Sequence, residues 1–169
     1  MLTVSSRALA AALLWLPLAC TATYRVADAV VTERNGQPCF APSDDPPVGS
    51  LNAVIVYDQS TTPPVSVWIA EIHPDGESKA PDGCIVYGQT FPNAKAAHLP
   101  AKALQTGRVY EVDLSVQPFD STDPTHGYSA RFCLVEQSSS AKLRVRQITW
   151  DKQAGRWHSE VCGAAQPKE

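Results

Sequence analysis

The sequence lacks the short motifs that mark most enzymes and metal sites. It contains no GxSxG nucleophile turn, no HExxH helix and no CxxC pair, the local patterns of serine hydrolases, zinc peptidases and zinc-binding or redox cysteines. The segment 158–160 (His-Ser-Glu) matches only half of a zinc deaminase signature, because no P-C-x-x-C follows it. We therefore predict a protein that is not an enzyme and has no metal or cofactor. Four separate histidines are interpreted as solvated side chains: His73, His98, His126 and His158.

The chain also lacks an excess of positive charge. Fourteen Lys and Arg residues against seventeen Asp and Glu give a net charge of −3, whereas nucleic-acid binding requires a basic surface. We therefore expect no nucleic-acid partner. Charged residues make up only 18% of the chain and hydrophobic residues 44%, a balance typical of a globular protein rather than a disordered one. Because no internal repeat or linker divides the 169 residues, we predict a single domain over residues 20–169.

Residues 1–19 have the pattern of a signal peptide for export. Arg7 is the only charge in this segment, and the following run, Ala8–Ala19, is apolar apart from Pro17. Such a run is too short to remain in a bilayer as a spanning helix. Two cleavage positions are open: one just before Cys20, as in bacterial lipoproteins, and one after Ala22, as in ordinary secretory proteins.

We expect lipidation of Cys20, because a single cysteine at the end of the apolar run otherwise has no evident role. Residues 17–20 (Pro-Leu-Ala-Cys) resemble a bacterial lipobox in which proline replaces the usual leucine. Thr21 stands where an aspartate would retain such a protein in the inner membrane. The sequence therefore predicts a periplasmic protein that is anchored to the outer membrane by lipid on Cys20.

Apart from Cys20, the chain has an even number of cysteines, which in an exported protein predicts two disulfide bonds. Four cysteines allow three pairings, and the sequence alone does not choose among them. We favour Cys39–Cys84 together with Cys133–Cys162, because the second pair lies within one local unit of three expected strands. Closing a loop of about 30 residues would stabilise the fold by roughly 3–4 kcal/mol.

Alternation of apolar and polar residues predicts β-strands along most of the chain. The Asn35-Gly36 pair predicts a tight hairpin, and Asp151–Gly155 predicts a turn between the last two strands. Strands are expected at Thr23–Thr32, Gln37–Ala41, Leu51–Tyr57, Val65–Ile72, Cys84–Tyr87, Tyr110–Val116, Tyr128–Leu134, Leu143–Trp150 and Arg156–Cys162.

One turn indicates the kind of β-fold. Leu104, Gly107 and Tyr110 are spaced three residues apart just before an alternating strand. This spacing resembles the E–F turn of fibronectin type III domains, in which the tyrosine hydroxyl bonds back across the turn to form a tyrosine corner. We therefore predict an all-β fold, a fibronectin type III or immunoglobulin-like β-sandwich, with an extra C-terminal hairpin.

An ordered series of short segments, from about Tyr24 to Cys162, resembles one family of exported proteins. That family comprises small periplasmic lipoproteins assigned as type VI secretion system immunity proteins. The lipobox, with its Pro17, is where this chain departs from them. The segments that carry the resemblance are Cys39-Phe40, Val67-Trp68, Asp82–Gly88, Gly107 with Tyr110 and Val112, Tyr128–Leu134, and Val145, Ile148, Trp150, Trp157, Val161 and Cys162.

The resemblance implies an immunity protein that binds a protein toxin delivered into the periplasm and blocks its active site or its access to substrate. Two other functions are open: an envelope structural or docking lipoprotein with a fibronectin-like domain, and a periplasmic hydrolase inhibitor. In each case the partner is a protein, with the membrane as a second partner through the lipid anchor. We expect the partner-binding residues among the polar residues of the C-terminal segment, namely Arg144, Arg146 and His158.

Overall fold

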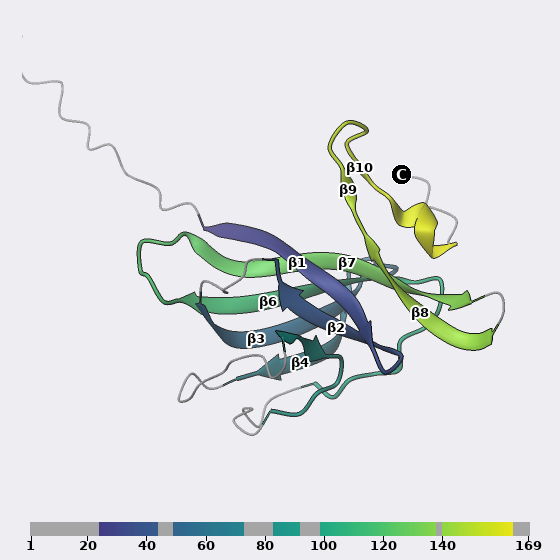
Figure 1. Cartoon of the computed structure of the whole chain (residues 1–169), viewed down its shortest axis with the longest axis horizontal. Coiled ribbons are helices and arrows are strands. Elements are labelled where there is room, and N and C mark those ends of the chain that lie inside the picture. The colour runs from purple at the N-terminus through teal and green to yellow at the C-terminus, as the bar shows by residue number, and fades with distance from the viewer. Residues whose placement is uncertain (1–23, 44–48, 73–82, 92–98, 138–139, 164–169) are drawn as a thin grey trace, which may run out of the picture.

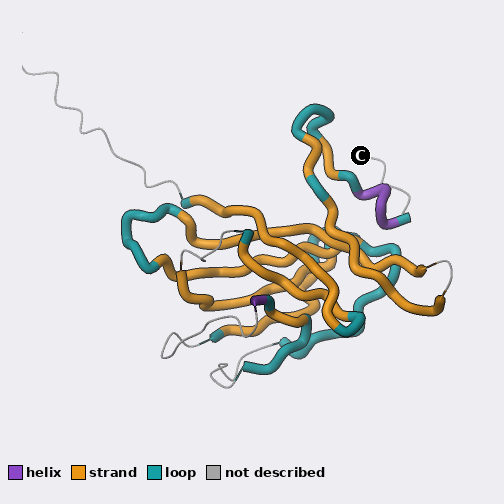
Figure 2. Tube along the Cα trace, viewed as in Figure 1, coloured by secondary structure: helices purple, strands orange, loops and turns teal. Residues whose placement is uncertain are grey.

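The computed structural model describes residues 24–43, 49–72, 83–91, 99–137 and 140–163, which are mostly β-structure (Figures 1 and 2). The expected signal peptide, residues 1–19, and Cys20 lie outside the described residues. Eight strands form one curled sheet in the order β4-β3-β6-β7-β1-β2-β5, with β8 paired to β7, and two further strands form a separate hairpin. The prediction of an all-β, sandwich-like fold with a C-terminal hairpin is confirmed.

The strands have the following bounds: β1 Arg25–Arg34, β2 Gln37–Pro42, β3 Gly49–Asp58, β4 Val65–Glu71, β5 Ile85–Val86, β6 Val109–Pro118, β7 Thr125–Gln137, β8 Ser140–Ile148, β9 Trp150–Asp151 and β10 Arg156–Trp157. A short 3-10 helix, η2, covers Ser159–Cys162. Within the described residues, no helix is both long and apolar enough to cross a membrane.

The two layers of the fold are joined through β1. The first layer consists of β4, β3, β6, β7 and β8, and the second of β2 and β5 (Figure 1). The first part of β1, Arg25–Asp28, pairs in parallel with β7, and its second part, Ala29–Arg34, pairs antiparallel with β2. The expected sandwich is therefore one continuous sheet that curls over its own core.

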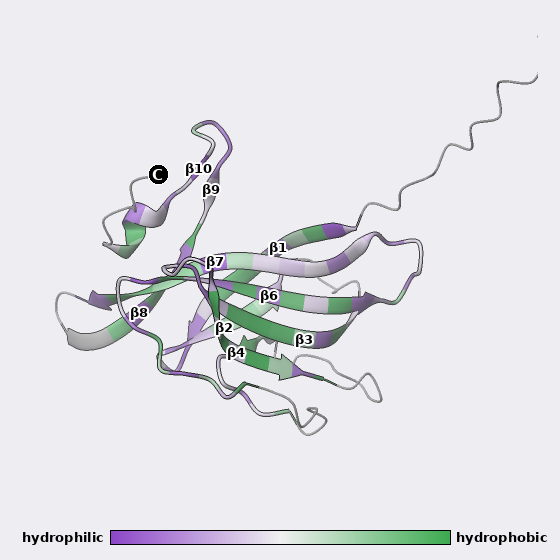
Figure 3. Ribbon diagram, turned by 180° about the vertical axis from the view of Figure 1, so that it is seen from behind, coloured by the Kyte–Doolittle hydropathy of each residue, from purple (hydrophilic) through white to green (hydrophobic). Residues whose placement is uncertain are grey.

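Aromatic side chains from both layers meet in the core. Phe40 of β2 lies with its ring centroid 5.4 Å from that of Phe132 on β7 and 6.5 Å from that of Trp68 on β4. Tyr110 of β6 stacks on Phe132 at 5.6 Å. All four side chains are buried, and burial of each such side chain stabilises a fold by roughly 1.5–3 kcal/mol. Hydrophobic residues recur along the first-layer strands β3, β4 and β6 (Figure 3).

Two predicted turns are confirmed. Asn35 and Gly36 both have positive φ, 54° and 77°, the backbone of a two-residue hairpin turn whose twist matches the flanking strands. At the tyrosine corner, the Gln105 N–H donates to the Tyr110 hydroxyl at 2.8 Å, and Gly107 turns the chain with a φ of 73°. The first turn sets the register of β1 and β2. The second leads into β6, and its Gly107 N–H also donates to the Leu134 carbonyl of β7 at 3.2 Å.

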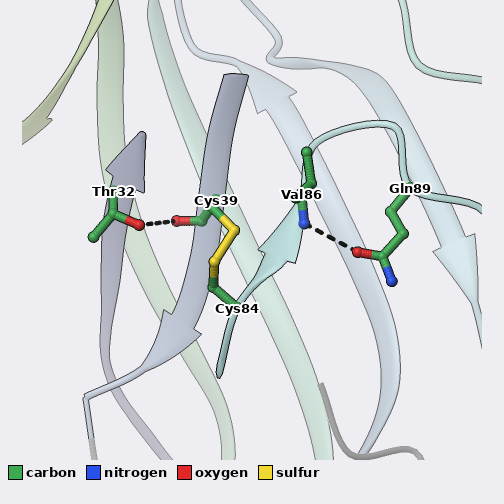
Figure 4. The surroundings of a disulfide bond; sticks show 5 residues. All are labelled: Thr32, Cys39, Cys84, Val86 and Gln89. Carbon is green, nitrogen blue, oxygen red and sulfur yellow. Dashed lines mark hydrogen bonds between the residues drawn. A yellow bond between two sulfur atoms is a disulfide. The ribbon is translucent and has the colours of Figure 1, made fainter. Parts of the chain in front are cut away.

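The Cys39–Cys84 disulfide joins β2 to the residue before β5, with a Cα–Cα distance of 5.5 Å (Figure 4). β5 ends the sheet on that side and is only two residues long. Its Val86 N–H donates to the Gln89 side chain at 3.2 Å, and the Gln89 N–H donates back to the Val86 carbonyl at 2.9 Å. The chain thereby covers part of an edge that would otherwise expose backbone groups.

The amide side chain of Gln147 fills the gap that opens where β1 leaves β7. On β8, its Oε1 accepts a hydrogen bond from the Val31 N–H at 2.9 Å, and its Nε2 donates to the Ala29 carbonyl at 3.0 Å. One side-chain amide thus satisfies a donor and an acceptor of β1 as a neighbouring strand would. Further along, the Val145 N–H donates to the Glu33 carboxylate at 3.2 Å. β8 is therefore attached to β1 mainly through side chains.

The last predicted strand, Arg156–Cys162, is wrong beyond Trp157. β10 ends there, and the following residues form η2. The reason is the disulfide from Cys162 to Cys133, which requires the chain to turn back to the sheet, whereas an extended strand would rise about 3.3 Å per residue away from it. The strand predicted at Leu143–Trp150 is likewise divided, because Thr149 separates β8 from β9.

Gln147→Leu should lower the free energy of unfolding by about 1–3 kcal/mol, because the Val31 N–H and the Ala29 carbonyl would lose their partners in a half-buried position. Urea denaturation followed by far-UV circular dichroism measures this change. Gln153→Leu, in an exposed turn, is the matched control and should change stability by less than about 0.5 kcal/mol. Equal effects of the two substitutions would contradict the role given to Gln147.

Candidate functional site

A small unit projects from the sheet after Ile148 (Figure 1). We call it the C-terminal unit; it comprises β9, β10, the turn between them and η2. The Cys133–Cys162 disulfide ties its end to β7, with a Cα–Cα distance of 5.8 Å. Beneath it lies a second core on the face of β7 and β8 that is turned away from the main core. Its buried members are Cys133, Ile148 and Cys162, with Val109, Val135 and Trp157 packed against them.

Two tryptophans face each other across the hairpin of this unit. Trp150 and Trp157 are directly paired on β9 and β10, with ring centroids 5.3 Å apart and an angle of 68° between the planes. The Arg131 guanidinium lies 4.5 Å from the centroid of Trp157, and its Nε donates to the Glu111 carboxylate at 2.7 Å. We call this series, from Glu111 to Trp150, the Trp–Arg stack.

The stack holds its outermost member in a defined position. An edge-to-face aromatic pair contributes about 0.5–1.5 kcal/mol beyond burial, and a cation–π contact about 0.5–1 kcal/mol at an exposed site. Trp150 nevertheless remains 48% exposed. The unit thus presents a large apolar side chain to solvent while restricting its conformational freedom.

The stack stands at the edge of a partly desolvated sheet face. Tyr57, Glu111 and Arg131 occupy directly opposed positions on β3, β6 and β7, and Asp113 with Ser129 forms the neighbouring pair. Burial raises the pKa of Asp113 and that of Tyr57. The nearby acids Asp113 and Glu111 raise the pKa of Tyr57 further. This face is therefore less hydrated than an ordinary sheet surface.

His158 lies between two carboxylates of the same unit. Its Nδ1 is 2.8 Å from Glu160 Oε1 and its Nε2 is 3.3 Å from Asp151 Oδ2. Asp151 also accepts the N–H groups of Ala154 and Gln153, at 3.0 and 2.8 Å. Those two N–H groups chiefly lower the pKa of Asp151, while the hydrogen bond from His158 chiefly lowers the pKa of Glu160. His158 therefore connects the hairpin to η2.

The structure brings two of the three predicted partner-binding residues together. Arg144 and Arg146 are exposed on β8, opposite Val135 and Cys133 of β7, and thus on the same face as the C-terminal unit. As alternate residues of one strand, they are about 6.5 Å apart. Arg144 donates to the Gln137 side chain at 3.2 Å. His158, in contrast, makes its contacts inside the unit.

Sequence reasoning missed Trp150 as a candidate binding residue. The available signal was its position on one side of the predicted turn, with Trp157 on the other. A four-residue loop over 152–155 pairs the two tryptophans across the strands. Of the other histidines, His73 and His98 lie outside the described residues. His126 packs edge-on against Tyr24, with ring centroids 4.5 Å apart.

A groove of about 670 Å³ lies elsewhere, between the β1–β2 turn, the residues after β5 and residues 101–104. The Tyr87 hydroxyl donates to the Lys102 carbonyl there at 2.8 Å. Burial raises the pKa of Tyr87 well above its usual value. None of the predicted partner-binding residues lines this groove.

No protein-family model, curated protein or solved structure matches this chain. Its function is therefore argued from its own residues.

The contact between the two tryptophans should weaken at low pH. In the folded protein, the pKa values of Asp151 and Glu160 lie below their ordinary values of 3.8 and 4.5. The ionised carboxylates therefore stabilise the unit fully at pH values above 3.8 and 4.5. This stabilisation is lost as the pH falls through the lowered pKa values and the carboxylates become protonated. We expect the near-UV circular dichroism of the Trp150–Trp157 pair to decrease as the pH falls below about 4, where these two carboxylates become protonated.

The variant Asp151→Asn with Glu160→Gln should show a weaker tryptophan signal already at pH 7, with little further change on acidification. Asp120→Asn is the matched control, because hydrogen bonds from Thr122 also lower the pKa of Asp120, in a loop outside the C-terminal unit. It should leave the tryptophan signal unchanged at pH 7. If the double variant retained the wild-type pH profile, the carboxylates would not hold the hairpin.

Proposed function

We propose that this protein is a periplasmic immunity protein, which binds and neutralises a toxin effector delivered by type VI secretion. The observation that supports this most is the exposed Trp150, held in place by the Trp–Arg stack in a unit that a disulfide ties to the sheet. A preorganised surface loses little conformational entropy on binding. Tryptophan and arginine are also the residues that most often dominate binding energy at protein interfaces.

Under this proposal the mechanism is stoichiometric. One molecule occupies one toxin molecule and covers its active site or its access to substrate, so that protection depends on the amount of protein present. Two disulfides suit such a protein, because disulfides form and persist in an oxidising compartment such as the periplasm. Lipid on Cys20 would keep the protein at the outer membrane, where it meets the incoming toxin.

If a neighbouring gene encodes the toxin, co-expression of this protein with it should rescue cells from periplasmic intoxication in proportion to the amount of this protein. The purified pair should form a one-to-one complex by isothermal titration calorimetry, with nanomolar affinity corresponding to about −12 kcal/mol. His126→Ala is the test for hidden catalysis and should leave rescue unchanged. Loss of rescue in this variant, with fold and complex intact, would instead indicate an enzyme that reverses the toxin's damage.

Cys20→Ala should move the protein from the membrane fraction to the soluble periplasm, because it removes the only expected site for the lipid. Fractionation of epitope-tagged cells measures this change, and Thr21→Ala serves as the control that retains the lipid. A wild-type protein that is fully soluble, with Thr23 as its N-terminal residue, would contradict lipidation and leave ordinary export.

A further inference from the structure

The C-terminal unit and the strand that leads into it carry a charge opposite to that of the whole chain. Residues 143–163 contain four basic and two acidic residues, a local net charge of +2 in a chain whose net charge is −3. All four basic residues are exposed: Arg144, Arg146, Lys152 and Arg156.

Both acidic residues of this segment face their own unit. Asp151 accepts hydrogen bonds from its turn and contacts His158, and Glu160 contacts the other nitrogen of the same ring. Within the described part of the chain, no ion pair involves Arg146, Lys152 or Arg156. Both carboxylates are thus engaged within the unit, while the Glu160 side chain stays 51% exposed. In addition to their hydrogen bonds, the charge of Arg156 acts on both carboxylates and lowers their pKa values. Arg146 and Lys152 are exposed to solvent.

Trp150 lies on β9 between two of the cationic residues, four positions after Arg146 and two before Lys152. Arg156 is paired with Asp151 and therefore lies on the other face of the hairpin. Its indole is half exposed. The buried side of the indole packs against Trp157, and the Arg131 guanidinium packs against the Trp157 ring. The charge of Arg131 is matched by Glu111, so the stack adds no uncompensated charge under the indole. The arrangement is an apolar anchor with cations near it.

We propose that this surface is the partner-binding site and that the partner presents an acidic patch around an apolar pocket that receives Trp150. This inference rests on the proposed function, whose toxin is the partner to be tested. The indole would supply most of the binding energy, because large aromatic anchors in desolvated pockets dominate interfaces. The cations would mainly accelerate association and select the acidic partner, since exposed interface charges act chiefly on the association rate.

The test measures toxin binding to four variants of the full mature protein by stopped-flow and titration calorimetry. Trp150→Ala should weaken binding at least about 30-fold. The pair Arg146→Glu with Lys152→Glu should slow association at least about tenfold at low salt, and the salt dependence of the association rate should decrease or change sign. Unchanged urea denaturation shows that each variant remains folded.

Two matched controls separate this surface from general effects of exposure and charge. Phe119→Ala removes another aromatic side chain, 75% exposed, from the loop between β6 and β7, and Lys102→Glu reverses an exposed charge beside the groove. Both should bind the toxin as the wild type does. Wild-type affinity for the Trp150 variant, together with a wild-type association rate for the charge-reversal variant, would overturn the inference and leave the proposed function standing. Absence of any wild-type complex would overturn both.

Discussion

The rest of the structure depends on β1 being shared between two layers. One strand that pairs first with β7 and then with β2 joins the layers directly, but it leaves backbone groups without a strand beside them where it departs from β7. A buried unpaired N–H or carbonyl costs about as much as a lost hydrogen bond. The amide of Gln147 meets this requirement for both Val31 and Ala29, and it does so from β8, which thereby lies beside β7 and β1 together.

This position of β8 explains why the C-terminal unit can be an appendage. The main core is formed by residues of the chain up to and including β8. The aromatic cluster around Phe40 and Phe132 contains no residue of the C-terminal unit. The hairpin therefore needs its own attachment, which the Cys133–Cys162 disulfide and the small core around Ile148 provide. An element attached in this way can keep Trp150 at the surface, because its burial is not needed to stabilise the domain.

The candidate site was only partly predictable, and the reasons are physical. The alternation of apolar and polar residues predicted that Arg144 and Arg146 lie on one face of a strand, and the structure confirms this. The prediction is reliable because side chains two residues apart in any strand point to the same face. The alternation also suggested that His158 was an exposed strand residue, whereas the ring bridges Asp151 and Glu160. The Trp–Arg stack could not be predicted in the same way. Glu111, Arg131 and Trp157 come from three strands, and only pairing between β6 and β7 and the return of the chain over β7 bring them together.

The sequence by itself determined the all-β class, the Asn35-Gly36 hairpin and the tyrosine corner at Tyr110, because each follows from the backbone preferences or hydrogen bonds of residues close in the chain. It also limited the disulfides to three pairings. Only the tertiary structure decided which cysteines meet, how β1 divides between two layers and where the last strand ends. Those features depend on segments far apart in the sequence, whose meeting is decided by how the whole core packs rather than by any local pattern.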